Sequence, residues 1–518
     1  MKKWLLRILA VIVILILAVI IFVYSNIRDR HPGYNVDINI PSPSSVSVFK
    51  AGFAALPITP EIVDTWNDVN NDARYKEKDG DTYNDNNDNG KFDAFWIAGF
   101  HSNRPANGVH DDVWARVAVF DDGNSRIALV SLDAIGFMHD DVVDVRERIP
   151  ENTDLDYVLI ASTHTHESYD LMGIWGQPPL KSGVDPEMMD YVKTQTVQAI
   201  ETAVINLRPA KLAFAQDLTG AAHLVKDTRE PIVKDDGLRL IQAIDTKADS
   251  TLGVVVGWAN HPETLWSKNL MISSDFPHYL REGIEKGLFK GDSLYMDGVG
   301  GTALFFNGAI GGLMCPHSSL PVKDPFKDTS YIEPSFDKTH AVGYQVASLA
   351  LDAIANPDTV VESAAMALKA KTMHLPLDNK VFTLAASIGI LNKGMVKWNK
   401  IRSEVAVFTI GPASFISLPG EIYPEIVNGG ITDADGRDYL VEPVEIPPLR
   451  ELMPGKYKFV IGLANDEIGY IIPKSEWDAA PPFMFDPTGP YGEENSLGPE
   501  TAPIIYKEMY NLLGKDGF

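Results

Sequence analysis

Short apolar runs of strand length recur along this chain, and this pattern constrains its fold more than any other feature. Clear examples lie at residues 126–132, 157–161, 252–258, 405–410 and 415–418. Helical periodicity separates such runs, for example over residues 186–205 and 339–354. Strands that alternate with helices predict an α/β fold with mixed β-sheets flanked by helices. Because no long polar linker interrupts residues 48–518, we expect one large domain there.

The N-terminus has the pattern of a transmembrane helix. Lys2, Lys3 and Arg7 precede an uninterrupted apolar run over residues 8–24. Counted from Trp4, the segment has about 21 residues, which is long enough to span a bilayer. Basic residues on its N-terminal side predict a cytoplasmic N-terminus, with the rest of the chain across the membrane.

A cleaved signal peptide is the alternative interpretation of this segment, and it would leave a secreted protein. The long apolar core and the absence of an Ala-x-Ala site favour an uncleaved signal anchor at residues 1–24. Residues 25–47 contain three prolines and predict a polar tether. We therefore expect a membrane-anchored protein whose domain lies on the periplasmic or extracellular side.

Charge and cysteine content exclude several classes of function. The net charge of −25 leaves no basic surface for phosphates, which argues against nucleic-acid binding. Cys315 is the single cysteine, so the chain forms neither an internal disulfide nor a thiolate zinc site. Any metal site must use His, Asp, Glu or Tyr ligands. Protein partners are not indicated by any motif.

An internal repeat stands apart from the rest of the domain. Residues 65–75 and 82–92 are similar at an offset of 17 positions. Oxygen-bearing side chains at alternate positions resemble the first half of an EF-hand loop, namely Asp68, Asn70, Asp72, Asp85, Asn87, Asn89 and Asp93. Trp96 stands where the second copy would need its bidentate Glu, so neither copy is a complete EF-hand. The segment 65–93 is either a pair of calcium-binding loops or a solvated polar excursion.

The most informative motif is residues 158–167, Val-Leu-Ile-Ala-Ser-Thr-His-Thr-His-Glu. An apolar strand runs into His164 and His166, and alternation along a strand sends both imidazoles to the same side. Neutral imidazole is a frequent metal ligand, and α/β enzymes commonly place chemistry at the carboxyl end of a strand. The motif predicts a metal or catalytic site; the alternative is a hydrogen-bonded pair of histidines.

Three later apolar runs end near other side chains able to bind a metal. One leads into His261-Pro262, a second delivers Glu421 at the start of an expected helix, and a third precedes Tyr470. In each case a strand stops close to a polar group.

Taken together, these segments resemble the neutral/alkaline ceramidase family. The resemblance follows one order over about residues 50–515. Its segments are Gly108-Val-His110 with Trp114-Ala-Arg116, Ala161-Ser-Thr-His-Thr-His166, Trp258 to His261 with Ile272-Ser-Ser-Asp275, Leu418-Pro-Gly-Glu421, Ala464-Asn-Asp-Glu-Ile-Gly-Tyr470 and the glycine-containing stretch after Tyr491.

The resemblance implies a zinc site and a set of catalytic groups. The implied zinc ligands are His164, His261, Glu421 and Tyr470. The resemblance also implies that His166 transfers a proton or supports the ligands, and that Tyr491 assists at the developing oxyanion. His110 would line the same cleft, and Arg229 would contact substrate. Zinc with an exchangeable water, beside an imidazole, supplies what amide hydrolysis needs.

Two departures from the family bear on substrate identity. Where the family has a serine, this chain has Met314 and Cys315, and a lone cysteine is either a thiol nucleophile or a small buried hydrophobe. The β-rich C-terminal domain typical of the family is also not expected here.

The sequence thus predicts a zinc-dependent amidohydrolase of sphingolipid metabolism, cleaving the N-acyl bond of ceramide or a related lipid-like amide. One alternative is a zinc hydrolase of carboxylic esters or non-lipid amides. Another is a catalytically silent, calcium-dependent surface-binding protein on the same scaffold.

Overall fold

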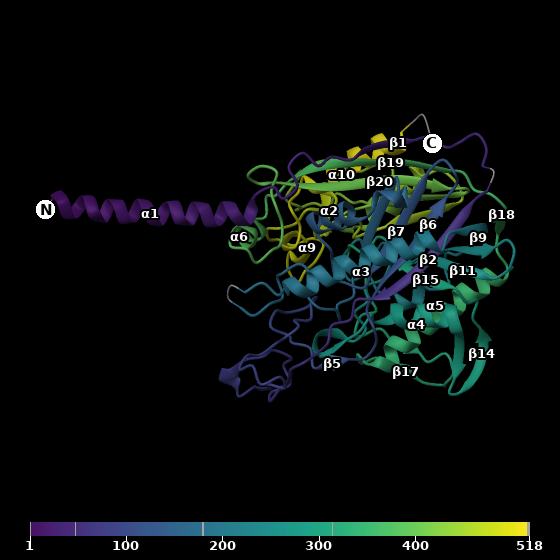
Figure 1. The fold of residues 1–518 in the computed structure, drawn as a ribbon, viewed down its shortest axis with the longest axis horizontal. Coiled ribbons are helices and arrows are strands. Elements are labelled where there is room, and N and C mark those ends of the chain that lie inside the picture. Colours follow the sequence, from purple (N-terminus) through teal and green to yellow (C-terminus); the bar gives the residue numbers. More distant parts are fainter. Residues whose placement is uncertain (1, 47, 179–180, 313, 515–518) are drawn as a thin grey trace.

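A computed structural model describes residues 2–46, 48–178, 181–312 and 314–514 of the chain. Two β-sheets face one another across a shared apolar core, and helices pack on their outer sides (Figure 1). This arrangement confirms the α/β class with mixed sheets flanked by helices.

The larger sheet has nine strands, in the order β15-β11-β10-β9-β2-β6-β7-β8, with β18 also paired to β9. The pairs β7–β8 and β11–β15 are parallel, and the other pairs are antiparallel. The strands are β2 (Lys50–Pro57), β6 (Trp114–Asp121), β7 (Arg126–Leu132), β8 (Tyr157–Ser162), β9 (Arg208–Asp217), β10 (Leu238–Asp245), β11 (Thr251–Gly257), β15 (Thr302–Phe306) and β18 (Thr359–Val361).

The smaller sheet has five strands in the order β1-β19-β20-β21-β23, of which only β21 and β23 are parallel. Phe120 and Leu159 of the larger sheet meet Phe408 and Phe415 of the smaller one in the central core. The strands are β1 (Asp37–Ile40), β19 (Met366–Pro376), β20 (Lys400–Ile410), β21 (Ala413–Ser417) and β23 (Tyr457–Ile461).

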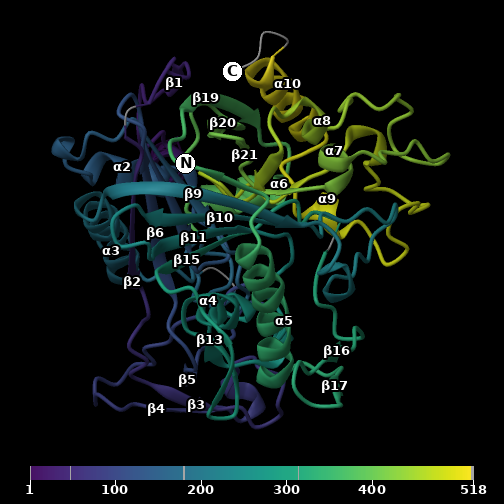
Figure 2. The same cartoon turned by 90° about the vertical axis from the view of Figure 1, so that its right-hand side faces the viewer.

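Helices cover both outer faces (Figure 2). Packed on the larger sheet are α3 (Pro186–Ile205), α4 (Phe276–Lys286) and α5 (Phe336–Ala355), with α2 (His139–Arg148) against α3. On the side of the smaller sheet lie α7 (Pro424–Asn428), α8 (Leu449–Leu452) and α10 (Thr501–Leu513), and two short helices, α6 (Lys380–Ser387) and α9 (Tyr491–Glu494), lie towards the N-terminal helix.

Five two-stranded pairs lie in the connections. The pair most relevant to function is β22 (Glu421–Ile422) with β24 (Tyr470–Ile471), which is parallel. The others are β3 (Thr65–Asn67) with β4 (Thr82–Asn84), β5 (Gly108–Val109) with β12 (Met271–Ile272), β13 (Gly287–Lys290) with β14 (Ser293–Asp297), and β16 (Val322–Lys323) with β17 (Ser330–Tyr331).

The two helices predicted from periodicity form, and their ends follow from local capping. α3 covers the predicted residues 186–205, because Asp185 caps it by accepting a hydrogen bond from the Met188 amide and Pro186 opens the first turn. α5 begins three residues earlier than the predicted 339, because Ser335 caps it.

The N-terminal helix α1 (Lys2–Ile27) projects from the domain (Figure 1). Among the described residues it is the one helix long and apolar enough to cross a membrane. The mean hydropathy of its most apolar stretch is 3.4, and no part of that stretch is buried in the domain.

Of the expected polar tether at 25–47, the described residues 25–46 pack on the domain at several points. Ile27 belongs to the core, Asp29 pairs with Arg402 at 2.8 Å, and β1 adds a strand to β19. The proline content predicted a free segment, but its apolar and charged side chains contact the domain. The helix therefore joins the domain through a packed segment rather than a free linker.

Candidate metal centre

His164 lies just beyond β8, in a loop rather than on the strand itself. β8 ends at Ser162, and His164 has a φ of 68°, in the left-handed region. The strand alternation that we expected to align His164 and His166 therefore does not operate here. The loop brings them together instead, with ring centroids 4.9 Å apart.

Backbone carbonyls orient two of the imidazoles. His164 Nδ1 lies 2.6 Å from the carbonyl oxygen of Ile135, and His261 Nδ1 lies 2.6 Å from that of Met314. Each Nδ1 donates to its carbonyl as an N–H, so each Nε2 faces the site; His261 Nε2 also lies within hydrogen-bond distance of Glu421, and each Nε2 offers a lone pair when its ring is neutral. Burial lowers the pKa of His164 to about 4, which keeps it in the neutral form that binds metals.

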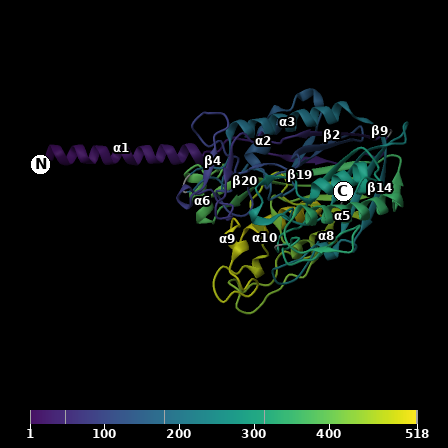
Figure 3. The same ribbon diagram turned by 90° about the horizontal axis from the view of Figure 1, so that it is seen from below.

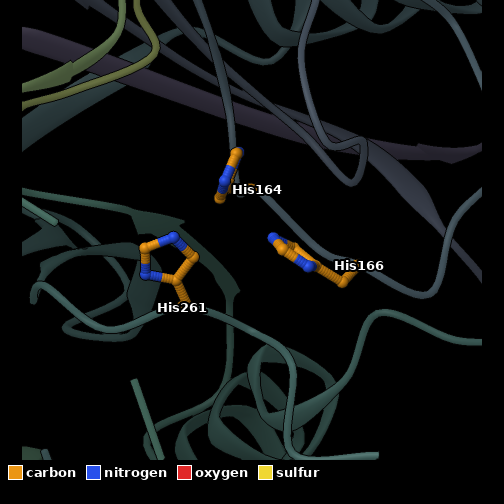
Figure 4. A group of neighbouring side chains, drawn as sticks. All are labelled: His164, His166 and His261. Atoms are coloured by element: carbon orange, nitrogen blue, oxygen red, sulfur yellow. The ribbon is translucent and has the colours of Figure 1, made fainter. Parts of the chain in front are cut away.

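A third imidazole completes the cluster (Figure 4). Among the described residues, one ring nitrogen each of His164, His166 and His261 lies within 4.8 Å of the other two, and all three side chains are buried. The ring centroids of His164 and His261 are 5.0 Å apart. This spacing is suited to a shared metal ion.

Glu421 and Tyr470 enter the same site from the β22–β24 pair. The two residues are direct partners in its register. Glu421 Oε2 lies 3.0 Å from His261 Nε2 and 3.6 Å from His164 Nε2. Burial alone would raise the pKa of Glu421, but the two imidazoles and a hydrogen bond with Tyr470 outweigh burial and lower it. All four ligands expected from the sequence therefore converge.

His166 has a different environment from the other two histidines. Its Nδ1 is 3.3 Å from Glu263 Oε2, and within the described part of the chain neither ring nitrogen makes a hydrogen bond of good geometry. Phe100 packs on the ring at a centroid distance of 5.0 Å. The imidazole is therefore held in place by packing, with nitrogen atoms available for proton transfer.

Two acidic residues at the site were missed by sequence reasoning. Glu263 follows His261-Pro262 directly, and burial raises its pKa to about 7. Glu467 lies in the Ala464–Tyr470 segment, and burial raises its pKa well above the usual carboxyl range. Their nearness to predicted ligands was a signal, but carboxyls at such positions are usually exposed.

An apolar pocket leads to these groups. It encloses about 800 Å³ of empty space, part of it open to solvent. His164, His166, Glu421 and Tyr470 stand at its polar end, and Tyr491 also lines it. The remaining wall is mostly apolar and includes Met138, Trp175, Leu377, Phe382, Leu391 and Leu497. Such an apolar pocket, open at one end, can receive an apolar group next to the histidine cluster.

Two residues expected in this cleft lie elsewhere. His110 is exposed, stacks on Phe336 with centroids 3.6 Å apart, and bonds Tyr279. Arg229 is buried, with its guanidinium committed to Glu476 and Glu493. Neither lines the pocket. The sequence did not reveal these competing partners because they are distant along the chain.

Met314 and Cys315, at the position of the family's serine, contribute differently from one another. The Met314 carbonyl orients His261, as described above. The buried Cys315 thiol donates a hydrogen bond to Glu263, and burial raises the pKa of the thiol well above its usual value. A thiol held in its neutral form is a poor nucleophile.

In the oxygen-rich insertion at 65–93, side-chain oxygens accept hydrogen bonds from backbone amides of the same loops. Asp68 Oδ1 accepts from the Asp72 amide at 3.2 Å, and Asp85 Oδ1 accepts from the Asn89 amide at 3.0 Å. Among the described residues, no group of three His, Cys or carboxylate ligands converges there. Calcium binding by this insertion stays a prediction.

No protein-family model and no curated protein matches the sequence. Solved structures do match in three dimensions. A neutral ceramidase from Pseudomonas aeruginosa superposes with a TM-score of 0.63 at 15% identity, covering 91% of this chain and 74% of that chain. A structure described as ceramidase complexed with C2 gives a TM-score of 0.62 at 14% identity, covering 90% and 75%. The chain has the ceramidase fold.

Proposed function

We propose that this protein is a zinc-dependent amidohydrolase that cleaves the N-acyl bond of ceramide or a related lipid-like amide. The observation that carries the proposal is the convergence of two oriented imidazoles and a buried carboxylate at the polar end of an apolar pocket. The ceramidase fold supports the substrate class, since the two solved neighbours are described as ceramidases.

The residues present fit a zinc ion. His164 and His261 offer Nε2 and Glu421 offers a carboxylate oxygen, which is a donor set of catalytic zinc sites, and the Tyr470 hydroxyl adds a further oxygen. The carbonyls that bond each Nδ1 fix the tautomer needed for binding through Nε2. Zinc bound there would lower the pKa of a water molecule and polarise the scissile carbonyl.

The chain's own groups would complete the reaction. His166 Nε2 or Nδ1 would carry a proton from the attacking water to the leaving nitrogen, with the Glu263 carboxyl 3.3 Å from Nδ1. The Tyr491 hydroxyl, at the pocket wall, would donate a hydrogen bond to the developing oxyanion. The apolar wall would bind the acyl chain and exclude water from the amide.

We further propose that α1 is an uncleaved signal anchor at residues 1–24, with the hydrolase domain at 48–518 outside the cytoplasm. Lys2, Lys3 and Arg7 on the N-terminal side of the span favour this orientation. A lipid substrate would then share a bilayer with the enzyme.

The test is turnover of a fluorescent N-acyl sphingosine and of an ester with the same acyl chain. We expect release of the amide's fatty acid, loss of activity after treatment with a zinc chelator, and recovery on adding zinc. Ester cleavage alone would favour the zinc esterase alternative. Calcium without zinc, and no turnover of either compound, would favour a silent binding protein.

A further inference from the structure

Helix α6 presents apolar side chains to the outside as well as to the pocket. Val381 and Leu384 are 70% and 60% exposed. On the other side of the helix, Phe382 lines the pocket and Ala386 is buried. A short helix that is apolar on its exposed face indicates a contact with an apolar partner rather than with water.

A neighbouring turn adds a third exposed apolar side chain. Trp398 is 65% exposed in a tight turn closed by a 2.9 Å hydrogen bond from the Lys400 amide to the Lys397 carbonyl. The turn adjoins the start of α6, because the Leu377 amide donates to the Asn399 carbonyl at 2.9 Å. Trp is the residue most typical of membrane–water interfaces.

The C-terminal end of α1 is fixed against this same region. Asn26 Nδ2 donates to the Ser387 carbonyl, at the end of α6, at 3.0 Å. The Met395 amide donates to the Ile27 carbonyl at 2.8 Å. Figures 1 and 3 both place α6 beside the end of α1. A packed junction sets the direction of the helix relative to α6.

The length of the exposed part of α1 matches a bilayer. From Trp4 to Phe22 the helix is exposed, and at about 1.5 Å per residue this stretch is about 28 Å long, close to the hydrocarbon core of a membrane. The span therefore ends where the domain begins. The bilayer surface then lies at the level of α6.

Basic side chains accompany the apolar ones. Lys380, Lys397 and Lys400 are exposed around Val381 and Trp398, although the whole chain carries a net charge of −25. Lysine stems lie along apolar surface while their ammonium groups reach phosphates at the membrane surface. With Asp378 as the neighbouring exposed acid, these three lysines leave the surface locally basic, which suits lipid phosphates.

We propose that α6 and the 397–400 turn insert into the outer headgroup layer of the bilayer that holds α1, so that the pocket opens directly to membrane lipid. The inference rests on the membrane anchoring proposed above. The occupant of this surface is a phospholipid bilayer. Phe382, on the pocket side of α6, would then stand between the lipid layer and the metal centre.

Fluorescence quenching in vesicles tests this surface. Full-length protein carrying Leu384→Cys is labelled with an environment-sensitive dye and reconstituted in phosphatidylcholine vesicles; native Cys315 is buried. We expect blue-shifted emission that doxyl-labelled lipids quench. Val360→Cys is the control, because Val360 is 50% exposed on β18, on the side away from α1 (Figure 1). It should show neither effect.

Equal, unquenched emission at both positions would overturn the inference. So would a blue shift at position 384 that depends on protein concentration and not on quencher lipid, since it would indicate a second copy as the occupant. If quenching occurs but no amide is hydrolysed, the surface stands and the proposed chemistry fails.

A second variant tests the consequence for substrate access. Val381→Asp with Leu384→Asp should slow hydrolysis of a vesicle-embedded long-chain amide about tenfold, because buried apolar area is lost from the lipid contact. Hydrolysis of a water-soluble short-chain amide should be unchanged, since neither residue lines the pocket. Equal loss on both substrates would contradict a role in membrane access.

Discussion

At the residue scale, the backbone of His164 adopts a conformation that is unfavourable for a residue with a side chain, with a φ of 68°. A non-glycine residue in the left-handed region costs about 1–3 kcal/mol, and such residues cluster at functional sites. The Ala134 carbonyl accepts from the His164 amide at 2.9 Å, and the Ile135 carbonyl holds its ring. The surrounding loop therefore imposes this conformation, which directs Nε2 towards Glu421.

His166 and His164 should differ when each is replaced by alanine. His166→Ala removes a proton carrier and is expected to lower kcat by about 10²–10⁴-fold while zinc content stays near that of the wild type. His164→Ala removes a proposed ligand and should lower both kcat and zinc content. Metal analysis and initial rates on the same preparations check this. Loss of zinc from the His166 variant would instead make that imidazole a ligand.

The sequence could indicate the residues of this cluster because each follows an apolar run, and strand ends are where polar groups are positioned. His164, His261 and Glu421 illustrate this directly. Positions decided by long-range partners could not be derived in the same way. Arg229 is held by Glu493, and the buried Glu263 contacts Cys315 and His166, both distant in the sequence.

At the scale of elements, α2 is joined to the two sheets by a buried ion pair. Arg146 donates to Glu404 Oε1 at 2.8 Å and Oε2 at 2.9 Å, and Tyr157 on β8 donates to the same carboxylate. Burial alone would raise the pKa of Glu404, but Arg146 outweighs burial and lowers it. The pair therefore stabilises the fold above the carboxyl's unfolded pKa, and less as pH falls below it.

Arg146→Ala should destabilise the domain by about 3–5 kcal/mol, because Glu404 would be left buried and uncompensated. Arg148→Ala is the matched control on the same helix. Its pair with Asp190 is exposed, so its loss should change stability by no more than about 1 kcal/mol. Denaturant unfolding at neutral pH measures both. Similar midpoints for the two variants would show that the buried pair does not hold α2 to the sheets.

Elements with strong periodicity were predictable, whereas their pairing was not. The run at 126–132 forms β7 with the expected bounds, since five of its seven residues are apolar and all but Arg126 are buried. β1 was hidden within an apparent tether, because Ile38 and Ile40 alternate with polar residues over only four positions. Its partner β19 lies more than three hundred residues away. Local pattern carries no information about such a distant strand.

At the scale of the whole molecule, the stacked sheets place the histidine cluster and the apolar helix α1 on a common framework. β8 supplies the loop of His164, while the smaller sheet leads into β22 and β24. The same sheet receives β1 shortly after α1. The position of the pocket relative to α1 is therefore built into the fold.

Full-length protein should remain in the membrane fraction after alkaline carbonate extraction, because α1 exposes an uninterrupted apolar surface. Protease added to intact spheroplasts should digest the domain, since the basic N-terminal flank predicts an outside location. A chain lacking residues 1–24 in the mature protein, found free in the medium, would favour the cleaved signal peptide. A domain protected from protease would contradict the orientation.

The central claim is that His164, His261, Glu421 and Tyr470 hold one zinc ion, and the zinc content of the purified full-length protein tests it most directly. We predict about one zinc per chain in the wild type and in His374→Ala, an exposed histidine on β19. His164→Ala and His261→Ala should each retain little. A wild-type protein without zinc, or equal zinc in all four proteins, would contradict the account.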